Sequence, residues 1–495
     1  MKSKNTHRST PAPAAENNIP DTITSGRMTF FQRLGKYLPL LIALLTGLIA
    51  IKRELWFDEA LTLMNFVIPM SAGGIYNNYA IPNNHIVYNM MLKIFAMPLA
   101  ESGWCDPVTV FRMFSLAAML AALAVIMDLR GKIDSGRVFP GGLVLSVMAT
   151  SMIWMNYATA IRGYALSFFW TALALYGLYD IFHDRARRGW TLFAISSVLA
   201  AGSVPSNLLA LAAAVLYAIQ WLPERFWRDK RFYIACAVPL LALIVFYAPI
   251  AGAFLNTFSL GEGFPSRWGA IAMVLGMYAS CFGLLLIFAP WGICKQPWRC
   301  YLTYLIWLMP ILAILILHRA PFPRIFVPLL PVLAMLVIDG IAKVTLKAWK
   351  AYHLALFLLL ALCVQTMLIM SGYAVSAKVS LDPVEDDFFH PYYMQKNYRP
   401  SLVAHKIAGQ AGDRVVFISF NSDPLPMRFY SVMSGLKCSM SVDVPNNSVK
   451  SLPDGSLAVL HTRRDDVQAF EERFNCRLQK VEEIKYVTLY RVKSR

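Results

Sequence analysis

Two adjacent carboxylates, Asp58 and Glu59, follow the first long apolar run of the chain, in the segment KRELWFDEALTL. Trp56 and Phe57 stand immediately before them, so the pair is expected to be partly desolvated and to feel its own mutual repulsion. Both effects raise the pKa of a carboxylate and suit it to taking a proton from a nucleophile. The alternative is an ordinary acidic pair on a helix at a membrane surface.

Arginines form a second group, at the outer ends of the apolar segments assigned below. Arg112 lies in VFRMFS, Arg162 in IRGYAL and Arg324 at the end of HRAPFPR, with Arg319 and Arg267 in nearby loops. A guanidinium fork can bind two oxygens of one phosphate. Taken singly, each arginine could instead reach from a helix end to the water layer. Together with the carboxylate pair, they favour a reaction beside a lipid-borne phosphate.

His85, in IPNNHIVYN, is a third candidate, either as a metal ligand or as a donor to the phosphate. A single histidine is more often simply hydrogen-bonded to its surroundings. No second histidine, cysteine or carboxylate stands at ligand spacing from it, so the sequence argues only weakly for a metal. The sequence also contains no Walker loop, dinucleotide fingerprint or Gly-x-Ser-x-Gly elbow, which disfavours nucleotide-driven chemistry.

The composition decides the class of protein. Of the 495 residues, 57% are hydrophobic and only 15% are charged, whereas soluble domains carry about 25% charged residues. The 13% of aromatic residues excludes a disordered chain, and eight cysteines are too few for a disulfide scaffold. The net charge of +17 comes mainly from basic residues between the apolar runs, as expected for a polytopic membrane protein.

A membrane-spanning helix needs about 20 apolar residues. We expect eleven spans, near 37–52, 108–128, 138–157, 163–182, 189–204, 206–222, 232–251, 269–290, 300–317, 324–341 and 351–372. Residues 1–36 are polar and basic, and we expect a disordered cytoplasmic tail. With the tail inside, five cytoplasmic loops hold 15 Lys and Arg and the tail holds six, against about eight in the short segments outside. This bias supports the orientation.

The segment 84–100 is apolar enough to be a twelfth span, but counting it would place the basic loops HDRARR and PERFWRDKR outside. On a helix, His85, Asn89 and Lys93 would form one polar stripe on an otherwise apolar surface. That pattern is typical of a helix lying in the interface. We therefore predict one large extracytoplasmic loop, 53–107, within a membrane domain of residues 37–372.

Residues 373–495 are more charged, and predict a small extracytoplasmic α/β domain. Its expected strands are 414–420, 456–462 and 486–492, and its expected helices are 400–411 and 465–474. Cys438 and Cys476 lie in this domain, and whether they pair or stay as buried thiols is left open.

The order of these motifs resembles that of the GT-C membrane glycosyltransferases, in the branch of the protein O-mannosyltransferases and the lipid A aminoarabinose transferase. The segments that carry the resemblance are WFDEA (56–60), PNNH (82–85), FRMFS (111–115), RGYAL (162–166) and PFPRIFVPLLPVLAML (321–336). They cover most of residues 37–341 in order and spacing. Two departures are NNHI in place of an H-P-P motif and Ile325 in place of a tyrosine.

The resemblance implies a GT-C fold and an inverting sugar transfer from a polyprenyl-phosphate donor at the outer face of the membrane. The compact loops, without a large luminal insertion, favour a bacterial inner membrane. Asp58 would be the base, and Glu59 would support it or contact a substrate or a metal. Arg112, Arg162, Arg324, His85 and Tyr164 would bind the donor phosphate or the acceptor. The acceptor would be an envelope glycan, a lipid or a protein, with no nucleic acid involved; the sugar and any divalent metal are left open.

Two alternatives belong to other classes. A transporter or flippase of lipid-linked sugars would explain the spans and the outer arginines, but gives the carboxylate pair no task. It should also place polar residues through the depth of the bundle, whereas the middles of the expected spans are nearly free of charge. A non-catalytic assembly protein, whose outer domain binds a partner, is the third hypothesis.

Overall fold

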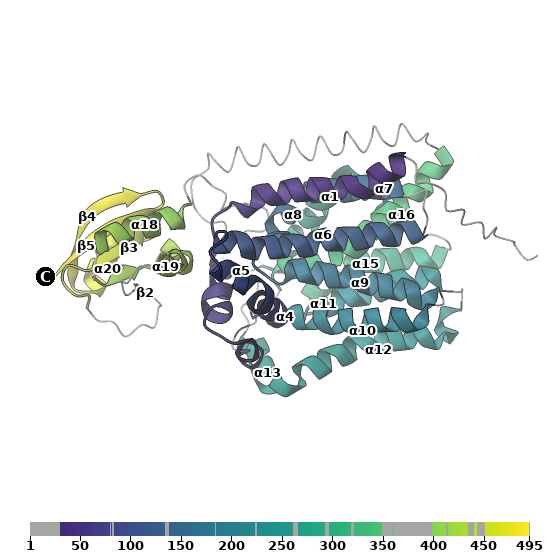
Figure 1. Ribbon diagram of the computed structural model, residues 1–495, viewed down its shortest axis with the longest axis horizontal. Coiled ribbons are helices and arrows are strands. Elements are labelled where there is room, and N and C mark those ends of the chain that lie inside the picture. Colours follow the sequence, from purple (N-terminus) through teal and green to yellow (C-terminus); the bar gives the residue numbers. More distant parts are fainter. Residues whose placement is uncertain are drawn as a thin grey trace, which may run out of the picture.

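The computed structural model describes residues 30–494, except 80, 82–83, 134–137, 184, 223–224, 261–265, 293–296, 318–320, 349–359, 361–397, 412–413, 434–439 and 443–450. Helices that lie side by side form one large bundle, and a small domain with a β-sheet lies at one end of it (Figure 1). A helical bundle with a small C-terminal α/β part agrees with the expected fold class, while the expected boundary at residues 372–373 lies outside the described residues.

The bundle is built from the apolar segments expected as spans. Its helical elements are α1 (Phe30–Ile51), α6 (Pro107–Ile133), α7 (Val138–Ala149), α8 (Met152–Tyr157), α9 (Tyr164–Phe182), α10 (Ala186–Ser203), α11 (Asn207–Ala218), η4 (Ile219–Trp221), η5 (Phe226–Arg228), α12 (Lys230–Tyr247), η6 (Ala248–Ile250), α13 (Ala251–Leu260), α14 (Arg267–Phe282), η7 (Gly283–Trp291), α15 (Pro297–Ile316), η8 (Pro323–Leu329) and α16 (Leu330–Ala348).

Six stretches of the described residues are long and apolar enough to cross a membrane, namely Arg33–Ile51, Pro107–Ile133, Tyr164–Phe182, Lys230–Asn256, Arg267–Trp291 and Pro323–Lys343. The other expected spans up to residue 317 are also helical, in shorter pieces. The span expected at 138–157 is divided into α7 and α8, because Ser151 leaves the helix and its side chain accepts a hydrogen bond from the Trp154 N–H. The eleventh expected span lies almost wholly outside the described residues.

One buried ion pair ties the interior of the bundle together. Arg130 on α6 contacts Asp339 on α16 at 2.7 Å, and the Tyr217 hydroxyl of α11 donates to the other oxygen of Asp339 at 2.6 Å. Each charge is therefore neutralised and hydrogen-bonded, as burial of a charge requires.

The expected outer loop 53–107 is a chain of short helices at the end of the bundle that faces the small domain (Figure 1). They are α2 (Phe57–Thr62), η1 (Leu63–Val67), α3 (Ala72–Asn77), α4 (Ile86–Met91), η2 (Leu92–Ala96) and α5 (Met97–Glu101). The expected polar stripe of 84–100 is used within the protein: Asn89 donates to Asn84, and Lys93 donates to the Ile68 carbonyl.

The C-terminal domain has a five-stranded sheet in the order β2-β1-β3-β5-β4. The strand β1 pairs in parallel with β2 and β3, and the β4–β5 hairpin extends the sheet in antiparallel fashion. Its elements are α18 (Pro400–Ala411), β1 (Val416–Ile418), η10 (Phe420–Ser422), α19 (Pro424–Met433), β2 (Met440–Val442), β3 (Leu457–His461), α20 (Val467–Arg473), β4 (Cys476–Ile484) and β5 (Val487–Ser494).

The three expected strands and two expected helices of this domain are present as β1, β3, β5, α18 and α20. The strands β2 and β4 and the helix α19 were not predicted from the sequence. The strand β4 is largely exposed, and its run of charged residues lacks an alternating apolar pattern. The helix α19 was not predicted because its first turn contains two prolines, which usually indicate a turn or a loop. Cys438 lies outside the described residues, so its pairing with Cys476 stays untested.

Candidate active site

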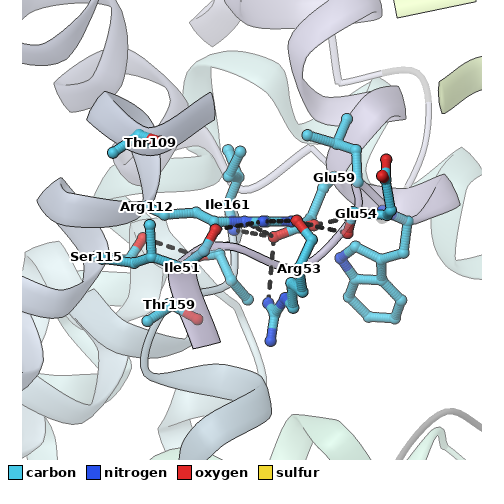
Figure 2. Close-up of polar contacts among 12 residues, drawn as sticks. Ile51, Arg53, Glu54, Glu59, Thr109, Arg112, Ser115, Thr159 and Ile161 are labelled. Atoms are coloured by element: carbon cyan, nitrogen blue, oxygen red, sulfur yellow. Dashed lines mark hydrogen bonds and ion pairs between the residues drawn. The ribbon is translucent and has the colours of Figure 1, made fainter. Parts of the chain in front are cut away.

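Glu59 is the centre of a buried ionic cluster in the structure (Figure 2). Its carboxylate contacts Arg112 Nη2 at 2.6 Å and Arg53 Nη2 at 3.3 Å, and all three side chains are fully buried. It also accepts the Ile161 N–H at 2.9 Å and the Trp56 N–H at 3.4 Å. One carboxylate thus ties together α2, α6 and the segment that leads into α9.

The contacts of Arg112 and Ser115 account for the motif FRMFS (111–115). Arg112 also donates to the backbone carbonyls of Ile51 at 2.8 Å and Glu54 at 3.0 Å, and to that of Arg53. Ser115, one turn further along α6, donates to the Ala160 carbonyl at 2.7 Å. Two residues on one helix face therefore fix the segment before α2 and the segment before α9.

The pKa of Glu59 differs from the sequence-based expectation. Burial would raise it, but the charges of Arg112 and Arg53 and the hydrogen bond from Ile161 hold the pKa of Glu59 below its usual value. The expectation that desolvation would make both carboxylates proton acceptors is therefore wrong for Glu59, because two guanidinium groups outweigh the desolvation.

Asp58 lies among different arginines. Its Oδ2 is 3.0 Å from Arg324 Nη2 and 3.8 Å from Arg162 Nη2. The side chain of Asp58 is 11% exposed and that of Arg324 is 17% exposed, whereas Arg162 is buried. The Arg324 guanidinium also lies 4.8 Å from the centre of the Phe322 ring. Asp58 and Arg324 therefore form the accessible side of the cluster.

His85 is close to both this ion pair and the start of α9. Its Nδ1 accepts the Gly163 N–H at 2.7 Å, and its Nε2 is 3.2 Å from Arg162 Nη2. Burial and the charges of Arg162 and Arg324 hold the pKa of His85 well below its usual value, so the ring is neutral. Since Nδ1 accepts, the single ring proton must be on Nε2.

It follows that two donors, His85 Nε2–H and Arg162 Nη2, point to the same neighbourhood. Two donors cannot hydrogen-bond to each other, so this arrangement is suited to a shared acceptor such as a phosphate oxygen. Gly163 makes the approach feasible, because a Cβ there would lie 2.6 Å from His85 Nδ1.

Tyr164 lies beside this pair rather than across from it. Its ring packs edge-on against His85 with 5.3 Å between ring centres, and against Tyr157 with 5.0 Å. The side chain is buried and fixes the plane of the imidazole. The structure thus places Asp58, Glu59, His85, Arg112, Arg162, Tyr164 and Arg324 in one region, divided into an inner cluster of Glu59 and Arg112 and an accessible cluster around Asp58. Arg267 is exposed and donates to the Leu317 carbonyl instead, and Arg319 lies outside the described residues.

The electrostatic balance of the region is positive. Arg53 and Arg112 surround Glu59, and Arg162 and Arg324 surround Asp58, so four guanidinium groups face two carboxylates. Such an excess in a largely buried place favours a bound anion. Among the described residues, no group of three His, Cys, Asp or Glu side chains is arranged to hold a metal ion.

Sequence reasoning missed several residues of the region. Arg53 precedes the carboxylate pair and had the appearance of an ordinary basic residue at the end of a span. The C-terminal domain contributes Tyr398, Tyr430 and Asp423, which lie far from α2 in sequence. The position of Arg53 at the outer end of the first span was the one sequence feature that could have indicated it. No local pattern indicated Tyr398, Tyr430 or Asp423.

No family profile matches the sequence, and no curated protein sequence matches it. Two crystal structures of ArnT from Cupriavidus metallidurans are similar to it in fold, each at 13% sequence identity over 92% of this chain and 97% of the ArnT chain. The TM-score is 0.58 for the apo state and 0.54 for the structure bound to undecaprenyl phosphate. The chain has the ArnT fold. The predicted GT-C fold, helical in the membrane and with a small C-terminal α/β part, is thereby confirmed.

Proposed function

We propose that the protein is an integral-membrane glycosyltransferase that moves a monosaccharide from a polyprenyl-phosphate carrier to an envelope glycan, lipid or protein. The observation that carries the proposal is the Asp58–Arg324 pair beside Arg162 and the His85 Nε2–H. It combines a partly exposed carboxylate with three donors suited to a phosphate. The shared fold supports it, because ArnT was crystallised with undecaprenyl phosphate.

In the proposed reaction, Asp58 takes the proton of the acceptor nucleophile as that atom attacks the anomeric carbon. The bond between this carbon and the phosphate oxygen breaks, and the stereochemistry inverts. The leaving polyprenyl phosphate gains one negative charge, while Asp58 loses its own by protonation. Arg324 is then released from its ion pair and can follow the charge onto the phosphate, next to Arg162 and His85.

The role that we propose for Arg112 differs from the predicted one, which was to bind the donor phosphate or the acceptor. Because Arg112 is fully buried against Glu59 and three backbone carbonyls, we propose that it fixes the position of α2. We assign the donor phosphate to Arg162, Arg324 and His85, with Tyr164 holding the imidazole in place.

The location follows from the charge bias of the loops. We propose a multi-pass inner-membrane protein with a cytoplasmic N-terminus, and with residues 53–107 and the C-terminal domain in the periplasm. The domain and the short helices of 57–101 lie at the same end of the bundle, as this requires (Figure 1). The reaction would take place at that end.

The experiment uses purified full-length protein, a panel of radiolabelled undecaprenyl-phosphate monosaccharides, and envelope membranes from a strain that lacks the protein. Label transferred from one donor to a product that organic solvent does not extract supports a transferase. Asp58→Asn should lose about 100-fold or more in turnover while keeping donor affinity, since a general base supplies that much. Glu101→Gln, an exposed carboxylate at the same end of the bundle, is the matched control.

A second pair of variants tests the phosphate site with undecaprenyl phosphate alone as the probe. Arg324→Ala should weaken its binding, whereas Arg267→Ala, an exposed arginine that donates to the Leu317 carbonyl, should not. No transfer from any donor by the wild-type protein, together with movement of a lipid-linked sugar across vesicles, would favour the flippase alternative. Full activity in Asp58→Asn would refute the assigned base.

A further inference from the structure

The segment that leads to Asp58 is held from two sides. On the bundle side, Arg112 donates to the carbonyl oxygens of Ile51, Arg53 and Glu54. The C-terminal domain holds the other side, as the following contacts show.

Both polar backbone groups of Leu55 are bound by tyrosines of the C-terminal domain. The Leu55 N–H donates to the Tyr430 hydroxyl of α19 at 3.2 Å, and the Tyr398 hydroxyl donates to the Leu55 carbonyl at 3.0 Å. Leu55 and Tyr398 are fully buried, and the Tyr398 ring packs against Tyr486 with 5.3 Å between centres. A buried backbone group that loses its partner is left desolvated and unsatisfied, so these hydroxyls specify the position of Leu55.

The residues on either side of Leu55 make further contacts with the domain. The Glu54 carboxylate accepts from the Ser401 hydroxyl at 2.7 Å and lies 3.4 Å from Arg399 Nη1, at the start of α18. The Phe57 ring packs edge-on against Phe420 with 5.9 Å between centres. The docked surface therefore extends to the residue immediately before Asp58.

Asp423 is a further member of this contact, and its protonation state affects the hydrogen bond between Tyr398 and Leu55. Its Oδ2 is hydrogen-bonded to the Tyr398 hydroxyl, which also faces the Leu55 carbonyl. The hydroxyl has one proton, and the carbonyl can only accept. If Tyr398 donates to Leu55, the Asp423 carboxyl must hold a proton and donate it to the phenol oxygen. If Asp423 is ionised, it attracts the phenol proton more strongly, and the Leu55 carbonyl loses its donor.

The surroundings favour the protonated carboxyl. Burial raises the pKa of Asp423 to about 7, the hydrogen bond from Tyr398 opposes this rise, and the charge of Asp58 adds to it. Its Oδ1 is enclosed and makes no hydrogen bond within the described part of the chain. The other charged or titratable groups of the contact are Glu54, Arg399, Tyr430 and Asp465, the last of which accepts hydrogen bonds from Ser419 and Asn421 in the segment before Asp423.

We propose that the C-terminal domain is part of the catalytic machinery, and that Tyr398, Tyr430 and Asp423 are positioning residues for Asp58. Tyr398 and Tyr430 hold the two polar backbone groups of Leu55, Asp423 holds the Tyr398 hydroxyl, and Leu55 sets the entry into α2, where Asp58 meets Arg324. The chain of contacts reaches the base without touching a substrate. This inference rests on the proposed function for its kinetic test only.

The kinetic test compares Tyr398→Phe, Tyr430→Phe and Asp423→Asn in the full-length protein, with the labelled undecaprenyl-phosphate monosaccharide that the wild type uses. A displaced base costs about 10–100-fold, so Tyr398→Phe and Tyr430→Phe should lower kcat by that factor and leave the donor KM unchanged. Asp423→Asn, whose carboxamide can still hydrogen-bond to Tyr398, should lose less kcat than a variant without a polar side chain at this position. Asp423→Gly has no polar side chain, adopts the left-handed backbone of this position (φ 58°) without strain, and should lose kcat about 10-fold.

A second readout needs no turnover. Hydrogen exchange of peptides covering residues 53–62 should accelerate in Tyr398→Phe and stay unchanged in Tyr490→Phe, a tyrosine on β5 of the same domain. Wild-type exchange and wild-type kcat in Tyr398→Phe would overturn the inference, as would a loss in Asp423→Asn equal to that in Asp423→Gly. A wild-type protein inactive with every donor would refute the proposed function, while the exchange data would still decide the positioning role.

Discussion

Replacing Glu59 with glutamine should destabilise the protein far more than replacing its neighbour Asp58 with asparagine. Glu59 is the single carboxylate between two buried guanidinium groups, those of Arg53 and Arg112. Glutamine keeps one acceptor oxygen and puts an amide donor in place of the other. In place of Oε1 that amide would face the Arg53 Nη2, Arg112 Nε and Ile161 N–H donors, and in place of Oε2 it would face the Arg112 Nη2 and Trp56 N–H donors.

The magnitude follows from the burial. Removing one partner of a buried ion pair costs about 3–5 kcal/mol, because the other charge stays desolvated. One kcal/mol shifts the unfolding midpoint of a 250-residue protein by about 2 °C, and a chain of twice that size responds by roughly half as much. Glu59→Gln should therefore lower the midpoint by about 3–5 °C. Asp58, which is 11% exposed, should shift it by about 1 °C or less.

The assay is thermal unfolding in one detergent, followed by intrinsic tryptophan fluorescence at one scan rate. Glu101→Gln serves as the exposed-carboxylate control, and Arg112→Gln as the opposite half of the pair. The double variant Glu59→Gln/Arg112→Gln should cost less than the sum of the two single changes, since it no longer leaves that guanidinium unpaired. A midpoint for Glu59→Gln within a degree of wild type would refute the view that this cluster anchors α2.

Three further outcomes are expected. Gly163→Ala should raise the donor KM about 10-fold in the transfer assay with little change in unfolding midpoint, because the new methyl group would lie 2.6 Å from His85 Nδ1. Arg130→Gln should lower the unfolding midpoint by an amount similar to Glu59→Gln and leave the donor KM unchanged, because it strands the buried Asp339. The pKa of Asp423 is raised to about 7 from 3.8, so wild-type stability should fall as the pH rises from about 4 to 7, whereas Asp423→Asn, measured by midpoint against pH, should lack this fall.

The bundle was predictable from sequence because each span is a long apolar run, and such a run has few other structures open to it. Ten of the eleven expected spans coincide with helical segments within the described residues. The division at Thr150–Ser151 was less predictable, since it rests on one capping hydroxyl within an apolar stretch. The polar edge strand β4 was missed because its pairing with β5, not its own pattern, makes it a strand.

The site was predictable where a charged residue lies at the end of an apolar run and therefore needs a partner of opposite charge. A carboxylate pair and several arginines at the same ends of apolar runs have few solutions other than contact with each other, and Asp58, Arg162 and Arg324 do lie together. The different environments of Glu59 and Asp58 were not predictable, because they depend on which arginines are buried. The contribution of Tyr398 and Asp423 depends on domain docking, which leaves no periodic signal in either segment.

The adjacency of Asp58 and Glu59 now has a geometric reason. Successive residues on a helix point about 100° apart, so two neighbouring carboxylates on α2 cannot face the same partner. Glu59 points into the bundle, where Arg53 and Arg112 hold it with no exposed surface, while Asp58 points to the accessible side beside Arg324. In the proposed mechanism, Asp58 can exchange a proton with a substrate because Glu59, fixed from the bundle, and Leu55, fixed from the C-terminal domain, hold the short helix α2 in place. A rigid anchor and a reactive group on consecutive residues are thus two requirements of one site.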